Sequence, residues 1–192
     1  GYSILLLEKY DFAKGTSSRS TKLIHGGVRY LAQGNIKLVR EALKERGLLL
    51  KNAPHLTRKQ AFIVPSDHWW EKWYYGTGLK IYDLLAGKLG IGKTEILSAD
   101  TVLQRLPVAE KKGLSGGVGY FDGQFDDARL AINMAETAVE QGAIVMNYIS
   151  VTGLHLHNKK ISGVDALDML DGGKYSLRSK AVINATGVFV DD

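Results

Sequence analysis

Hydrophobic positions in the first part of the chain form one unbroken apolar run, followed by several stretches with helical spacing. The run at residues 4–7 predicts a buried strand of a parallel sheet over residues 2–8, because a strand covered on both faces carries few polar side chains. Spacings of three and four predict helices, three of which begin at good N-cap residues: Asn35, Ser98, and Asp126 or Asp127. The expected helices cover residues 35–53, 68–88, 98–106 and 126–142.

Strands are expected between and after these helices. Residues 60–65 predict one strand, and residues 113–125 are interpreted as turn-rich strands that line a cavity. Further along, apolar and polar residues alternate singly, which is typical of half-buried strands, and the Asp-Gly-Gly sequence at residues 171–173 predicts a hairpin turn. The strands expected there cover residues 143–148, 151–157, 160–170 and 175–178, with a short buried strand at 181–184.

This order of elements indicates an α/β protein of mixed α+β character. A strand, a long mixed insertion, a helix, a β-meander and a last apolar strand fit a nucleotide-binding core interrupted by a second layer better than they fit a simple alternation. The 192 residues can hold one large domain or two small ones.

Composition limits the chemistry that the chain can perform. The sequence contains no cysteine, which excludes disulfides, thiolate metal sites and cysteine nucleophiles. A net charge of +5 and a pI near 9.3 suit an anionic ligand or surface, although a solvated basic surface explains them as well. No apolar run in the sequence is long enough to span a bilayer.

Residues 15–31 combine small hydroxyl residues, two adjacent glycines, a histidine and an arginine. Glycine allows the main chain to lie against a flat ligand, and Arg29 offers a planar, permanently charged fork for an anion. Glu8 ends the first apolar strand, where many dinucleotide-binding folds hold a ribose. Together these features indicate a flavoenzyme.

The chain resembles the FAD-dependent glycerol-3-phosphate dehydrogenases, which belong to the amino-acid-oxidase-like flavoproteins. The sequence Lys-Leu-Ile-His-Gly-Gly-Val-Arg-Tyr-Leu at residues 22–31 is close to that family's signature. Shorter matches are Leu-Glu at 7–8, Asp-Asp-Ala-Arg-Leu at 126–130 and Asn-Ala-Thr-Gly at 184–187. The resemblance implies oxidation of sn-glycerol 3-phosphate to dihydroxyacetone phosphate by hydride transfer to FAD, with the electrons passed on to quinone.

The resemblance also implies a role for each matching residue. Glu8 would bind the adenosine ribose, His25 would face the flavin ring, and Arg29 would contact the substrate phosphate or alkoxide. The implied catalytic residues are His25, Arg29 and Tyr30, and no metal is expected. The implied cofactor-binding residues are Glu8, Thr16, Ser17, Ser18, His25, Gly26, Gly27, Val151, Ala185, Thr186 and Gly187.

Parts of the family pattern are missing from these residues, including the Gly-x-Gly-x-x-Gly turn that holds the pyrophosphate. We therefore expect a fragment that binds FAD weakly or not at all and is inactive alone. A partial FAD-binding domain is expected at residues 1–55 and 125–192, and part of an inserted substrate-binding (cap) domain at residues 56–124.

Several positions have a structural as well as a functional interpretation. Glu8 could be a solvent-facing strand end, His25 a packed histidine and Arg29 half of a surface ion pair, although the motif around them favours the functional roles. The aromatic residues at 69–75 could lie at a membrane interface, but an aromatic core is the favoured interpretation. Two histidines that alternate along the strand at 151–157 could bind a metal, but no third ligand is evident.

Three functions remain open at this point. The first is the dehydrogenase, with glycerol 3-phosphate as substrate, quinone as electron acceptor and no nucleic-acid partner. The second is a related FAD-dependent oxidase of an amine or a 2-hydroxy acid, and the third is a non-catalytic truncated domain. We expect a cytoplasmic protein, with attachment to the inner face of the cytoplasmic membrane and the oligomeric state left open.

Overall fold

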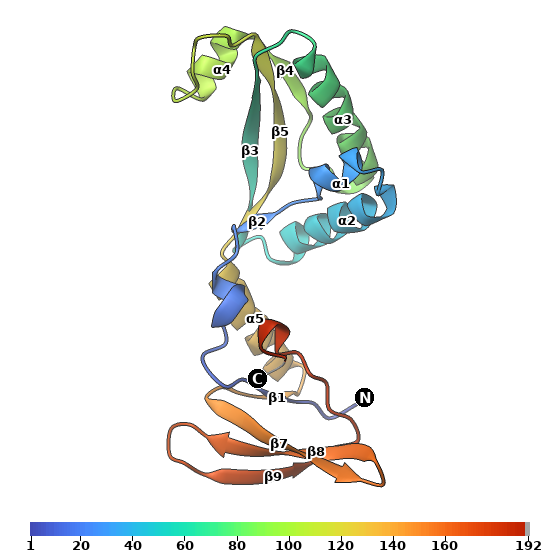
Figure 1. The fold of residues 1–192 in the computed structure, drawn as a ribbon, viewed down its shortest axis with the longest axis vertical. Helices are drawn as coiled ribbons and strands as arrows, with labels where there is room; N and C mark the ends of the chain where they lie inside the picture. Colours follow the sequence, from blue (N-terminus) through green and yellow to red (C-terminus); the bar gives the residue numbers. More distant parts are fainter. Residues whose placement is uncertain (191–192) are drawn as a thin grey trace. The chain divides into compact units, whose positions relative to one another are not determined.

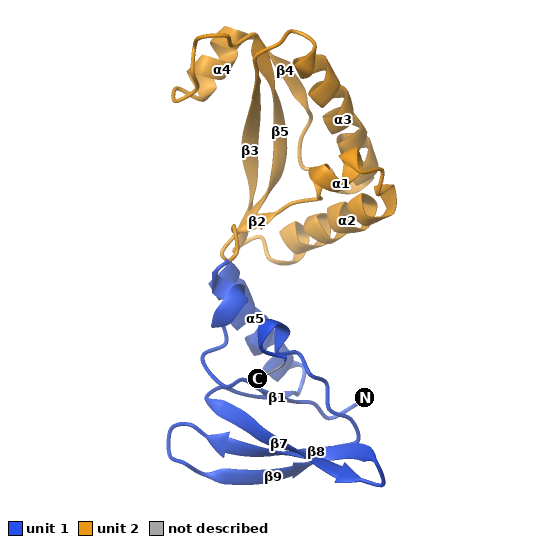
Figure 2. Cartoon of the chain, viewed as in Figure 1, with its two compact units in different colours: residues 1–19, 127–192 blue, residues 20–126 orange. Residues whose placement is uncertain are grey.

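A computed structural model describes residues 1–190 of the chain. These residues form two compact units, shown in different colours in Figure 2. Unit 1 contains the segment up to Arg19 together with the segment from Asp127 onwards, and unit 2 contains Ser20–Asp126. We describe each unit separately.

Unit 1 consists of a parallel pair of strands, one long helix and an antiparallel meander (Figure 1). The first strand pairs in parallel with the strand that follows the helix, which confirms the parallel sheet expected from the sequence. The elements in chain order are β1 (Leu5–Leu7), the 3-10 turn η1 (Gly15–Ser18), α5 (Asp127–Glu140), β6 (Ile144–Met146), β7 (Ile149–His157), β8 (Lys160–Asp168), β9 (Lys174–Arg178) and the 3-10 turn η3 (Gly187–Phe189).

The meander matches its prediction closely. Strands β7, β8 and β9 lie in sequence order in a three-stranded antiparallel sheet. The turn between β8 and β9 contains Gly172, whose φ is +81°, and the Asp171 carboxylate accepts a hydrogen bond from the Gly173 N–H at 2.7 Å. A left-handed glycine beside an aspartate that bonds the backbone is the chemistry that such turns require.

Two expectations about burial in unit 1 are wrong. Strand β1 forms where it was expected, but Leu5 and Leu6 are exposed by 41% and 43%. Residues 181–184 form no strand, and Ile183 is 88% exposed. A strand needs a neighbour for its backbone N–H and C=O groups, and among residues 1–190 no strand pairs with that segment.

Unit 2 is built on a four-stranded antiparallel sheet in which β5 pairs with three other strands (Figure 1). Within the stretch at 113–125, expected as several turn-rich strands, residues 116–125 form one continuous strand that pairs with β3 along its whole length. The elements in chain order are β2 (Leu23–Ile24), α1 (Val28–Ala32), α2 (Ile36–Asn52), β3 (Thr57–Ser66), α3 (Glu71–Ala86), the 3-10 turn η2 (Gly87–Leu89), β4 (Glu95–Leu97), α4 (Ala99–Arg105) and β5 (Gly116–Phe125).

The core of unit 2 lies between its helices. Val39 and Leu43 from α2 pack with Tyr82 and Ala86 from α3, and residues of α1 close the cluster from one side. Helix α2 begins at its predicted cap, where the Asn35 side chain accepts a hydrogen bond from the Leu38 N–H at 3.2 Å. The helix therefore presents a fixed apolar face to α3.

The aromatic cluster near the start of α3 is exposed, which makes the expectation of an aromatic core wrong. Trp73 and Tyr74 are exposed by 54% and 66%. The buried positions of α3 are instead Gly76, Leu79, Tyr82 and Ala86, which recur at helical spacing on the face toward α2 and the sheet. No helix among residues 1–190 is long and apolar enough to cross a membrane.

The two units divide the chain differently from the expected domains. The boundary expected from the sequence lies between residues 55 and 56, whereas residues 20–55 belong to the same compact unit as the sheet and α3. The reason is the shared core, because α1 and α2 bury their apolar faces against α3. Which functional domain each segment belongs to stays a prediction.

Candidate functional site

The signature segment at residues 22–31 runs from the sheet of unit 2 into its helical layer. Leu23 and Ile24 form β2 and pair with Gln124 and Gly123 at the end of β5. The chain then leaves the sheet through His25, Gly26 and Gly27 and enters α1. A short strand on one side and a helix on the other therefore hold both ends of the histidine and glycine turn.

Glycine is needed at each of the two adjacent positions of this segment for a different structural reason. Gly27 precedes α1 with φ at +75°, in the left-handed region that favours glycine. Gly26 is buried, and a Cβ built on it would overlap the Leu43 side chain and the Tyr82 hydroxyl. Its N–H donates a 2.6 Å hydrogen bond to that hydroxyl. Gly26 is thus required by close approach and Gly27 by backbone conformation.

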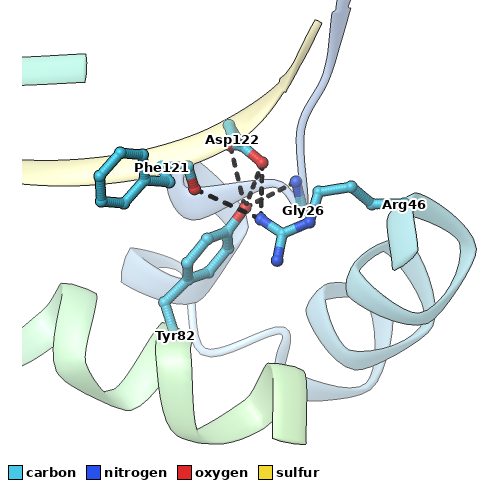
Figure 3. A network of polar contacts seen from close by, with 5 residues as sticks. All are labelled: Gly26, Arg46, Tyr82, Phe121 and Asp122. Carbon is cyan, nitrogen blue, oxygen red and sulfur yellow. Dashed lines mark hydrogen bonds and ion pairs between the residues drawn. The ribbon is translucent and has the colours of Figure 1, made fainter. Parts of the chain in front are cut away.

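The Tyr82 hydroxyl belongs to a buried polar network, shown in Figure 3. It donates to the Asp122 carboxylate, with its oxygen 3.1 Å from Oδ2. The Arg46 Nη1 atom lies 2.7 Å from Asp122 Oδ1 and also donates to the Phe121 carbonyl at 3.5 Å. Helices α2 and α3, strand β5 and the signature segment all meet at this point.

Burial gives this network its electrostatic character. Arg46 is 2% exposed and Asp122 is 3% exposed, so each charge is stabilised by the opposite charge rather than by water. Burial raises the pKa of the Tyr82 phenol, and the negative charge of Asp122 raises it further. The hydroxyl therefore keeps its proton at neutral pH, donates it to Asp122 and accepts from Gly26. Burial and then Asp122 also raise the pKa of the nearby Tyr120.

Sequence reasoning missed this network as a unit. The helical spacing over residues 35–53 puts Arg46 on the apolar face without an evident partner, and Asp122 lies in the stretch interpreted as turn-rich strands. The signal was present, because a charged residue on an apolar helical face calls for a buried counter-charge. The identity of the counter-charge needs the tertiary structure, since Asp122 follows Arg46 by 76 positions.

A pocket of about 510 Å³ lies beside the network in unit 2. His25 and Arg46 both line it, and the Arg46 Nε atom is buried with no hydrogen-bond partner among the described residues. His25 itself is exposed. The other lining residues are Leu23, Ile24, Ala42, Glu45, Leu48, Leu49 and Asn52.

The structure brings the three expected catalytic residues onto one short segment. His25 precedes the two glycines, and Arg29 and Tyr30 lie in α1 directly after them. All three side chains are exposed. The Arg29 guanidinium and the Tyr30 hydroxyl are therefore accessible to a ligand, whereas the backbone that carries them is anchored in the core.

Two of the expected cofactor residues lie close together in unit 1. Glu8 directly follows β1, and its C=O accepts a hydrogen bond from the Ile149 N–H at 2.9 Å. Its carboxylate accepts from the Tyr10 N–H, also at 2.9 Å. Val151 lies two positions after Ile149 in β7 and is 47% exposed. Unit 1 therefore places an acid at a strand end beside an exposed apolar residue, which suits a ribose and an adenine.

The hydroxyl turn also lies in unit 1. Residues Gly15–Ser18 form η1, which contacts α5. Thr16 and Ser17 are exposed and Ser18 is half-buried, while a Cβ built on Gly15 would lie 3.5 Å from the Phe189 ring. Gly15 of the turn thus lies next to Phe189 of η3.

The Ala-Thr-Gly sequence is exposed and is not part of a strand. The Thr186 N–H and hydroxyl both donate to the Asn184 side chain, at 3.0 and 2.7 Å. Ala185 and Gly187 are exposed, and Gly187 has a φ of +60°. Exposed hydroxyls and left-handed glycines in unit 1 fit the kind of ligand expected there, a phosphorylated nucleotide.

The metal alternative finds no support in residues 1–190. His155 Nε2 lies 2.7 Å from Asp165 Oδ1, so the strand does have a carboxylate that the sequence pattern did not reveal. A register shift between His155 and Leu156 interrupts the simple alternation toward His157. No group of three side chains among the described residues is arranged to hold a metal ion.

The family model for FAD dependent oxidoreductases matches residues 1–192, and the chain belongs to this family. Among curated proteins it is 42% identical to the mitochondrial glycerol-3-phosphate dehydrogenase of Rattus norvegicus over the whole chain and 28% of that protein. It is 41% identical to the aerobic glycerol-3-phosphate dehydrogenase of Staphylococcus epidermidis, again over the whole chain and 35% of that protein.

The chain is also similar to a solved structure of a glycerol-3-phosphate dehydrogenase. The glycerol-3-phosphate dehydrogenase of Bacillus halodurans complexed with FAD aligns with a TM-score of 0.68 and 30% identity, covering 93% of this chain and 28% of that one. The mixed α/β fold expected from the sequence is thereby confirmed. The chain spans only about a third or less of the length of the relatives named here.

The core around Gly26 has no room for a side chain, so this position should be sensitive to substitution. Replacing Gly26 with alanine should lower the free energy of unfolding by about 1–3 kcal/mol, because the new methyl group would push against Leu43 and the Tyr82 hydroxyl. Urea unfolding followed by circular dichroism measures the change.

Gly78→Ala is the matched control for this substitution. Nothing lies within 4 Å of a Cβ at Gly78, and alanine is the better helix former by roughly 1 kcal/mol, so this variant should be neutral or more stable. Equal unfolding midpoints for the two variants would contradict the packing argument.

Proposed function

We propose that the protein containing this chain oxidises sn-glycerol 3-phosphate to dihydroxyacetone phosphate by hydride transfer from C2 to FAD, with quinone as the electron acceptor. One observation carries the proposal: the His-Gly-Gly-Val-Arg-Tyr segment is anchored in the core of unit 2 while its His25, Arg29 and Tyr30 side chains are exposed. The similarity to glycerol-3-phosphate dehydrogenases over the whole chain supports the choice of substrate.

The chemistry assigns a different task to each exposed side chain. Arg29 is suited to bind the phosphate, because its guanidinium can donate two parallel hydrogen bonds to an anion. The C2 hydroxyl must lose a proton as the hydride leaves, and imidazole is the usual proton acceptor near neutral pH, which favours His25. The Tyr30 hydroxyl can hydrogen-bond a substrate hydroxyl and orient it.

We propose that Glu8, Val151, the hydroxyl turn at Thr16, Ser17 and Ser18, and the Ala185–Thr186–Gly187 sequence hold the nucleotide part of FAD. Gly26 and Gly27 would approach the flavin ring together with His25. The support is chemical: a strand-end acid for ribose hydroxyls, small hydroxyl residues for phosphates, and glycine where main chain must come close.

An FAD-dependent oxidase of an amine or a 2-hydroxy acid is the main rival. Such an enzyme would share Glu8 and the Ala-Thr-Gly sequence but would not need Arg29 directly after the glycines. A non-catalytic domain is the other rival, and it would show no flavin reduction with any of these substrates. Both are separated from the dehydrogenase by the variant experiment below.

Replacing Arg29 with alanine in the full-length protein should raise KM for glycerol 3-phosphate by more than about tenfold, because a hydrogen bond to a charged group contributes roughly 1.5–3 kcal/mol. Steady-state kinetics with a quinone analogue measures KM and kcat. The control is Arg40→Ala on α2, which removes an exposed arginine outside the signature segment. Unchanged kinetics in both variants would mean that Arg29 does not contact the substrate.

We also propose that the 192-residue chain alone binds FAD weakly and does not turn over, because the Gly-x-Gly-x-x-Gly turn is not among its residues. Titration of the purified chain with FAD, followed by quenching of flavin fluorescence, should give a dissociation constant above about 100 μM. The binding free energy is then weaker than roughly 5.5 kcal/mol. Micromolar binding with a shifted visible flavin band would contradict this proposal.

We also propose that the protein associates peripherally with the inner face of the cytoplasmic membrane. The exposed aromatic residues of unit 2 support this proposal. Trp69, Trp70, Trp73 and Tyr74 are all more than half exposed at the start of α3. Lys72 and Lys80 accompany them. Aromatic rings near basic side chains are typical of surfaces that lie in the interface of an anionic bilayer.

Replacing Trp69, Trp70 and Trp73 together with serine should reduce binding of the full-length protein to vesicles containing anionic phospholipid by about tenfold or more, since each buried aromatic ring contributes to interfacial affinity. Co-sedimentation measures the bound fraction. Val108→Ser removes another exposed apolar side chain of unit 2 and should leave binding unchanged. Equal binding by the tryptophan variant would rule out this surface.

A further inference from the structure

The Tyr82 hydroxyl links the signature segment to the two buried charges of unit 2 (Figure 3). It accepts the Gly26 N–H at 2.6 Å and donates to the Asp122 carboxylate, which in turn accepts from Arg46. The Tyr82 ring is 1% exposed and packs in the core between α2 and α3. The hydroxyl is therefore held in position from two sides, by packing of its ring and by the ion pair.

The hydrogens of this network have only one consistent arrangement. An ionised carboxylate only accepts and a guanidinium only donates, so Arg46 and the Tyr82 hydroxyl both direct hydrogens toward Asp122. The Tyr82 oxygen then presents a lone pair to Gly26, whose N–H can only donate. The hydrogen bonds therefore converge on Asp122, from Gly26 through Tyr82 on one side and from Arg46 on the other, and this arrangement fixes where the Gly26 N–H lies.

The position of Gly26 determines the positions of its neighbours. His25 is the preceding residue, and Arg29 lies three residues later in a helix that begins immediately after Gly27. A buried glycine that contacts the Leu43 side chain and the Tyr82 hydroxyl has little freedom to shift. Displacing it would move the imidazole and the guanidinium together, and a misplacement of 1 Å is enough to slow an enzyme considerably.

We propose that Tyr82, oriented by Asp122 and Arg46, is the positioning residue for the segment from His25 to Tyr30. This inference rests on the proposed function of that segment. Tyr82 does not contact the substrate. It holds the backbone from which His25 and Arg29 project, so its hydroxyl contributes to catalysis through them.

The test is Tyr82→Phe in the full-length protein, which removes the hydroxyl and keeps the ring in the core. We expect kcat/KM for glycerol 3-phosphate to fall by about tenfold and the visible flavin band to change shape. Tyr120→Phe is the matched control, because Tyr120 is also a partly buried tyrosine near Asp122, but its ring stacks on Phe62 at 5.4 Å. The control should stay within about twofold of the wild type.

A double variant separates positioning from a general loss of structure. If Tyr82 acts through the segment, adding Tyr82→Phe to Arg29→Ala should lower kcat/KM by clearly less than the roughly tenfold expected in the wild-type background, because the part of the effect that passes through Arg29 is already lost. Fully additive effects would overturn the proposal, and so would an unchanged kcat/KM in Tyr82→Phe. If Tyr82→Phe does not fold, Gly26→Ala displaces the same backbone without touching the buried ion pair, and the same non-additivity with Arg29→Ala is expected.

Failure of the proposed function gives a different result. In that case wild-type protein with bound FAD shows no flavin reduction by glycerol 3-phosphate. The flavin band of Tyr82→Phe then decides the matter, because a displaced His25 and Gly26 change the surroundings of the flavin whichever substrate is used. A band identical to wild type would overturn the positioning role as well.

Discussion

The buried ion pair between Arg46 and Asp122 is the constraint on which unit 2 depends. It joins the middle of α2 to strand β5 through atoms 2.7 Å apart, with both side chains almost completely buried. Leaving one charge of such a pair without its partner typically costs about 3–5 kcal/mol. The pair therefore favours the position of α2 on the sheet that brings these charges together. The Tyr82 hydroxyl extends this constraint to the signature segment through Gly26.

Local features of the fold were predictable because they depend on neighbours in sequence. The caps at Asn35 and Ser98 form as expected, with side-chain acceptors 3.2 Å from the N–H groups of Leu38 and Thr101. The meander was also predictable, because single alternation and an Asp-Gly-Gly turn specify antiparallel strands without distant information. Each of these elements is determined by a few residues that are close together in the sequence.

Burial was harder to predict, because it depends on what packs against an element. The apolar sequence at 181–184 was interpreted as a buried strand, yet no strand of residues 1–190 pairs with it. The tryptophans near the start of α3 have the spacing of a core helix, yet the buried face of that helix is offset from them and centred on Leu79 and Tyr82. An apolar side chain predicts a surface that avoids water, but it does not say which surface covers it.

The candidate site divides in the same way. The segment at residues 22–31 could be recognised from its sequence, because glycines, an imidazole and a guanidinium stand within a few positions of one another. Arg46, Tyr82 and Asp122 could not be assembled into a site beforehand, because they come from separate elements up to 76 residues apart. Sequence therefore identified candidate ligand-facing groups but not the groups that hold their backbone in place.

The order of residues in the signature segment follows from this support. The first glycine lacks a Cβ because Tyr82 and Leu43 occupy that space, and the second turns the chain through a left-handed conformation into α1. If the left-handed residue stood at position 26 and the closely packed one at position 27, the helix would begin one residue earlier. A shift of one residue rotates a helical side chain by about 100° around the axis, since a turn holds about 3.6 residues. The direction in which Arg29 projects would then change, so its placement relative to His25 is set by the packing beneath the segment.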